Sequence, residues 1–158
     1  MAYIYPAPGV TGVQATLSIS IASNASDTGL TVPALQDVTV NNANDVFTWT
    51  QLDSGSKQQI ATTATNSLGM NLVLEQTSFF GDSTATTGTA ANSGMFGLSK
   101  NKTKVSFELY LGDTDGGATG KTISGDGYIT GLAPTVSADA PVWVSPITVT
   151  VDGDYTVS

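Results

Sequence analysis

Apolar and polar side chains alternate with a period of two residues in several parts of this chain, and this pattern restricts the fold more than any other feature. The clearest stretch is TKVSFELYL at 103–111. A period of two is that of a β-strand with one buried face. Stretches 15–23 and 147–151 repeat the pattern. We expect 103–111 and 147–151 to share a core. The residues that line it are Val105, Phe107, Leu109, Leu111, Ile147, Val149 and Val151.

Turn-forming residues divide the rest of the chain into further short segments. Strands are expected at 38–40 and 46–50, with a tight connection of turn-prone residues at 41–45. Residues 90–99 predict one short helix. Eight or nine short strands with at most one short flanking helix predict an all-β fold, either a two-sheet β-sandwich or a small barrel. The 158 residues are enough for one core, so we expect a single β-sandwich domain over 1–158.

Two segments are expected to lie outside the strands. Residues 1–12 contain Pro6 and Pro8 and predict an extended N-terminal arm. Residues 51–68 are polar around Ile60 and predict a long polar loop. Loops of this length without structure of their own are uncommon in compact domains and are usually functional or disordered. We therefore interpret this one as a candidate assembly loop, whose contacting residues are Gln51, Leu52, Asp53, Lys57, Gln58 and Ile60.

Histidine, cysteine and arginine are all absent from the sequence. Their absence excludes Ser–His–Asp and Cys–His catalysis, and it removes the thiolate and imidazole ligands of zinc and iron sites. The remaining reactive groups are carboxylates, lysines, tyrosines and hydroxyls. We therefore expect a protein that is not an enzyme, with no catalytic residue, no metal site and no cofactor.

The chain is acidic, with 13 acidic residues against 5 basic ones and a formal net charge of −8. A surface of this sign repels nucleic acid and anionic membranes. No signal peptide is visible at the N-terminus and no apolar run approaches 18 residues, so no membrane association is expected. Lys100, Lys102 and Lys104 alternate before the strongest strand. They predict either a guarded strand edge or a basic stripe that meets acids on a neighbouring copy.

The sequence over roughly 46–157 resembles the tail tube (major tail) proteins of long-tailed bacteriophages. The resemblance lies in the strand 103–111 with the following Gly112-Asp113 turn, in GDGYIT at 125–130, and in the stretches 133–143 and 146–153. The polar stretch that begins at Thr50 is similar to a long β-hairpin loop which, in that family, reaches the next ring.

The resemblance implies a virion structural protein of the phage tail, made in the host cytoplasm. Copies would assemble with one another into hexameric rings, stacked into a tube around a channel through which DNA passes without specific binding. Repulsion by surplus acids suits such a channel. The candidate lumen acids, on or beside central strands, are Glu75, Glu108 and Asp126.

Other functions stay open at this stage. One is a capsid decoration protein or a host-binding, immunoglobulin-like virion protein, and another is a secreted adhesin or fimbrial subunit. A hydrolase that uses carboxylates is a weaker alternative. Open tubes or stacked rings of the purified protein would favour the tail tube, whereas monomers or trimers would favour a decoration protein.

Overall fold

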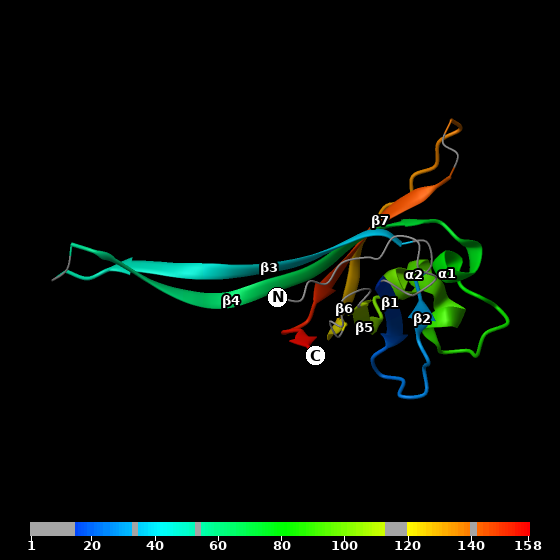
Figure 1. The fold of residues 1–158 in the computed structure, drawn as a ribbon, viewed down its shortest axis with the longest axis horizontal. Coiled ribbons are helices and arrows are strands. Elements are labelled where there is room, and N and C mark those ends of the chain that lie inside the picture. The colour runs from blue at the N-terminus through cyan, green and yellow to red at the C-terminus, as the bar shows by residue number, and fades with distance from the viewer. Residues whose placement is uncertain (1–14, 33–34, 53–54, 113–119, 140–141) are drawn as a thin grey trace.

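The computed structural model describes residues 15–32, 35–52, 55–112, 120–139 and 142–158, so the expected arm at 1–12 lies outside the described residues. The expected all-β class is confirmed. In the described part, strands are joined with two short helices in the order β1 (Ala15–Ile21), β2 (Leu30–Thr31), β3 (Leu35–Thr50), β4 (Lys57–Val73), α1 (Gln76–Phe80), α2 (Ala90–Lys100), β5 (Lys104–Leu111), β6 (Lys121–Leu132), β7 (Val144–Val151) and β8 (Thr156–Val157). The molecule consists of a body and a long hairpin that projects from it (Figure 1).

The strands form one antiparallel, hydrogen-bonded sheet in place of two separate ones. Their order is β2-β1-β5-β6-β7-β4-β3, and β8 pairs with β6. The register aligns apolar residues across neighbouring strands. Leu17 lies opposite Leu109, and Leu68 lies opposite Val149. Because side chains alternate along every strand, this alignment directs the apolar residues of five strands to the same face of the sheet.

The core lies on that face, as predicted from the alternating strands. Val105, Phe107, Leu109, Ile147 and Val149 are at most 1% exposed. Leu111 and Val151 pack against this core at its rim, where they are partly buried. The two helices cover one end of the sheet and add the buried side chains of Phe79, Ala90, Met95 and Leu98.

The helix expected at 90–99 is present as α2, whereas α1 was not expected. The two helices contact each other through their backbones, and a glycine lies on each side of this contact. Gly81 and Gly94 both have positive φ angles, 100° and 64°, and a Cβ atom at either position would collide with backbone atoms of the other helical segment. Only glycine fits at such a contact.

Two expectations for the region that forms β3 and β4 are wrong. Residues 41–45 are not a turn, because β3 continues without interruption through them. Most of 51–68 is not a loop, because β4 begins at Lys57 and leaves only 51–56 to connect the strands. The distal hairpin (41–52 and 55–65 of the described residues) is exposed on both faces, so apart from VFTWT at 46–50 its sequence lacks the alternation that a buried face imposes. Its threonines, Val46 and Ile60 nevertheless favour extended backbone.

Candidate assembly surface

The hairpin of β3 and β4 extends far beyond the rest of the sheet (Figure 1). β4 pairs with β7 only over Ser67–Val73, so among the described residues the distal part of the hairpin pairs only with itself. Every described side chain at 41–52 and 55–65 is exposed. A two-stranded hairpin without a third strand or a packed face is at best marginally stable in water. The distal hairpin therefore has the properties of an element that is completed by a partner.

Three large apolar side chains lie on one face of this distal hairpin, and we call them the hairpin strip. Phe47 lies directly opposite Ile60, and the ring of Trp49 stacks on that of Phe47 with 5.9 Å between centroids. Phe47 is 59% exposed, Ile60 55% and Trp49 36%. Contiguous exposed apolar side chains on a soluble domain mark interaction surfaces.

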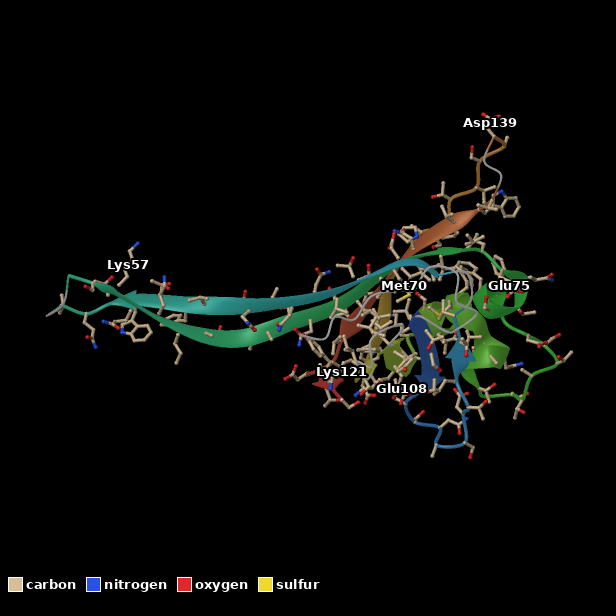
Figure 2. The ribbon with its side chains drawn as sticks, in the orientation of Figure 1. Lys57, Met70, Glu75, Glu108, Lys121 and Asp139 are labelled. Carbon is tan, nitrogen blue, oxygen red and sulfur yellow. The ribbon has the colours of Figure 1, made fainter. Side chains whose placement is uncertain are left out.

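The candidate assembly residues from the sequence fall at the end of this hairpin. Leu52 is fully exposed in the connection, and Ile60 belongs to the hairpin strip. Gln58 lies opposite Trp49, whereas Lys57 lies opposite Thr50 and so belongs to the other face (Figure 2). Gln51 is exposed before the turn, and Asp53 lies outside the described residues.

Sequence reasoning missed Phe47 and Trp49, which contribute the largest side chains of the strip. The signal was present in VFTWT at 46–50, where aromatic residues alternate with threonine. That alternation is compatible with an apolar face. The pattern alone does not identify that face, because Val46, Thr48 and Thr50 do not form a clean polar face opposite the aromatic residues.

The sheet also has a long free edge. β3 is the last strand of the sheet, and within the described residues its outer edge has no strand partner along its 16 residues. Proteins usually protect such an edge with lysine, proline or a very short strand. β3 contains no lysine and no proline, and its protection is limited to Asp37, Asp45 and register shifts at its start and near Asn44. The edge between these interruptions is long enough to pair with a strand of another chain.

A second polar region lies on the face of the sheet that points away from the core. Asp126 of β6 lies opposite Ser106 of β5. The Ser106 hydroxyl donates a 2.6 Å hydrogen bond to the Asp126 carboxylate. Glu108 is on the same face of β5. The strands and the C-terminal segment form a shallow groove here, and its acidic residues are Glu108, Asp126, Asp152 and Asp154.

Lys104 neutralises part of this acidic groove. Its ammonium lies 2.8 Å from the Asp152 carboxylate and 3.8 Å from that of Asp126. The hydrogen bond to Asp152 is the main reason that the pKa of Lys104 is raised. Because β5 lies between β1 and β6, Lys104 is not at an edge of the sheet. The prediction that it guards a strand edge is therefore wrong for this residue.

Glu75, the third candidate lumen acid, is separate from the groove and caps α1. Its carboxylate accepts a 2.8 Å hydrogen bond from the backbone N–H of Ser78 and further bonds from the hydroxyls of Thr77 and Ser78. These donors, the Ser78 N–H above all, lower the pKa of Glu75 to about 2. Figure 2 shows Glu75 beside the helices, away from Glu108. The structure therefore brings together two of the three candidate acids and adds Asp152 and Asp154.

Within the described ranges, no group of three or more acidic side chains is arranged to hold a metal ion. In the same ranges, neither helix has the length and apolar character needed to cross a membrane.

Comparison with known proteins gives matches by structure alone. No protein-family model and no curated protein matches the sequence. The SPP1 tail tube is similar with a TM-score of 0.63 and 10% identity, over 94% of this chain and 80% of that one. The tail of an empty gene transfer agent (GTA) particle has a TM-score of 0.61 and 12% identity, over 90% and 95% of the two chains.

A chain of the PVC sheath–tube complex, from an extracellular contractile injection system, is also similar. Its TM-score is 0.61 with 14% identity, over 98% of this chain and 92% of that chain. At these identities the likeness shows the fold. The resemblance to tail tube proteins that the sequence predicted is thus confirmed at the level of the fold, over nearly the whole chain.

Proposed function

We propose that this protein is a virion structural protein, the subunit of a tail tube that assembles with copies of itself into stacked rings around a channel. The observation that carries the proposal is the distal hairpin, which within the described part of the chain pairs only with itself and exposes an apolar strip. The fold shared with the SPP1 tail tube supplies the architectural context. An element of this kind is stable and useful only when a neighbouring subunit covers it.

Six copies in each ring are the arrangement that we propose. The similar GTA tail was described with C6 symmetry, which supports this number. The long free edge of β3 supplies main-chain donors and acceptors for pairing between subunits. The tube would lie in the tail of the virion, and its subunits would be made in the host cytoplasm.

The acidic groove is proposed to face the channel. Glu108 and Asp126 lie on the polar face of the sheet, and the chain carries a net charge of −8 without arginine. A channel wall of that sign repels the phosphate backbone, so DNA would pass without specific binding. Glu75 is less suited to this role than the other two acids, because its carboxylate is engaged in capping α1.

Removal of the distal hairpin tests the proposal. Asn44 lies directly opposite Ala64, so residues 45–63 can be replaced by Asn-Gly, a two-residue turn that suits directly opposed strands. The matched control is Gln59→Asp, which changes the other face of the hairpin and keeps the hairpin strip, because Gln59 lies opposite Thr48. Negative-stain microscopy and sedimentation velocity report on assembly, and circular dichroism reports on folding.

We expect the parent and the control to form open tubes or stacked rings, and the long deletion to remain a folded monomer. Normal tubes from the long deletion would contradict the assigned role of the hairpin. Monomers or trimers from the parent protein at high concentration would favour a capsid decoration protein instead.

A further inference from the structure

The two helices carry a second exposed apolar surface, formed by Phe80 of α1 and Phe96 of α2, which we call the helix patch. Phe80 is 59% exposed and Phe96 is 41% exposed. Their ring centroids are 6.0 Å apart, and both rings contact that of the fully buried Phe79, at 4.9 Å and 6.3 Å. The exposed rings thus continue the core outward to the surface.

The backbone beneath the helix patch is held firmly. The contact between Gly81 and Gly94 fixes α1 against α2. Asp27 fixes α2 against the sheet, because one oxygen of its carboxylate accepts hydrogen bonds from the N–H groups of Ile21 in β1 and Ala90 in α2, at 2.8 Å and 2.9 Å. Aromatic side chains on a fixed backbone lose little conformational freedom on binding, which favours docking.

The helix patch and the hairpin strip cannot meet within one molecule. The helices lie at one end of the molecule and the tip of the hairpin lies at the other (Figure 1). A contact between them therefore joins two copies, and it joins different surfaces on the two copies. Contacts of this head-to-tail type repeat from copy to copy and build rings or open stacks.

The two surfaces are complementary in chemistry. Both are aromatic, and offset or edge-to-face packing of such rings adds to the burial of their apolar area. The directly opposed pairs of the hairpin strip, Phe47 with Ile60 and Trp49 with Gln58, carry no charge, because Lys57 lies on the other face of the hairpin. Docking of these pairs on the two phenylalanine rings therefore buries no charged side chain of the strip.

We propose that the helix patch is the surface of a second copy of this chain that receives the hairpin strip. This inference rests on the proposed tube function and identifies the receiving partner of the hairpin. Phe47, Trp49 and Ile60 of one subunit pack on Phe80 and Phe96 of the next. The contact buries all five side chains, which are exposed in the single subunit.

Disulfide trapping tests the contact. Because the chain has no cysteine, every disulfide joins two introduced cysteines. The Ile60→Cys variant is mixed before assembly with Phe96→Cys or, in a second mixture, with Phe80→Cys. Two positions on the helix patch are used because Ile60 can lie closer to either phenylalanine of the neighbouring copy. A third mixture uses Trp143→Cys. Trp143 is 52% exposed and belongs to another apolar surface, beside Val73 and Leu74. Each mixture is exposed to a mild oxidant, and dimers are scored on a non-reducing gel.

A disulfide forms only where the two Cα atoms come within about 7 Å. We expect cross-linked dimers from the mixtures with Phe96→Cys or Phe80→Cys, and at least tenfold less from the mixture with Trp143→Cys. Tubes that cross-link only through Trp143→Cys, only between two copies of Ile60→Cys, or not at all would overturn this inference while leaving the tube function in place. Parent protein that forms no tube or ring would overturn both.

Discussion

Replacing Phe107 by alanine tests whether the polar–apolar alternation of β5 was assigned to the correct face. Phe107 is 1% exposed, and its ring lies over Gly125 on the neighbouring strand. A Cβ atom placed on Gly125 would lie 3.1 Å from the ring's Cζ atom, which shows that the ring covers the glycine. The alanine variant would leave that space empty, because Gly125 has no side chain to fill it.

The expected loss follows from that geometry. Truncating a buried phenylalanine costs about 3–5 kcal/mol, and the cost rises with the volume that the surroundings cannot refill. We therefore expect the upper half of this range. For a chain of this size each kcal/mol lowers the melting temperature by about 2–4 °C, so the melting temperature should fall by roughly 8–20 °C.

Thermal unfolding followed by circular dichroism measures the shift, and urea unfolding measures the free energy directly. Tyr110→Ala is the matched control, since Tyr110 is an aromatic residue of the same strand, on its other face, and is 39% exposed. It should cost no more than about 1 kcal/mol. Equal melting temperatures for the parent and Phe107→Ala, or a larger loss for Tyr110→Ala, would show that the core lies on the other face of β5.

Three further results are expected. Ile60→Asp should abolish tubes and leave the melting temperature within a few degrees, whereas Gln59→Asp on the other face of the hairpin should still assemble, as seen by sedimentation velocity. Asp27→Ala should cost about 1–3 kcal/mol in urea unfolding, because the N–H groups of Ile21, Gly29 and Ala90 lose their acceptor; an unchanged midpoint would refute this. Glu75→Gln should lower stability by about 1 kcal/mol or less at pH 7.

The effect of Glu75→Gln should also depend on pH. The pKa of Glu75 is lowered from 4.5 to about 2 in the folded state. Its contribution is therefore complete above about pH 4.5 and is lost as the pH falls through 2. Melting curves of parent and variant should converge between pH 4.5 and pH 2. A difference that stays constant over that interval would contradict the assigned cap.

The parts of the fold that the sequence predicted are those with one buried and one exposed face. Phe107 and Val149 could be assigned to the core because burial on one side imposes a period of two on the side chains. Apart from VFTWT at 46–50, the distal hairpin lacks that signal, because solvent reaches both of its faces. Its extended conformation depends on pairing between β3 and β4, which a local pattern does not contain.

The site was predictable to a similar extent and for similar reasons. Ile60 was found because it is apolar in a polar stretch, but Phe47, which faces it, needed the register of the hairpin. Lys104 and Asp152 are distant in sequence, and only the sheet order brings them together. Glu75 was a candidate by its charge and its place beside an expected strand, whereas its role as a cap depends on a short helix that forms where Gly81 meets Gly94.

Cryo-electron microscopy of the assembled protein tests the central claim most directly. We predict hexameric rings stacked into a tube, in which the hairpin strip of each subunit is buried on another subunit and Glu108 and Asp126 face the channel. A channel lined by lysines with these acids packed on the outside, or hairpins that remain exposed to solvent in the assembly, would contradict the account.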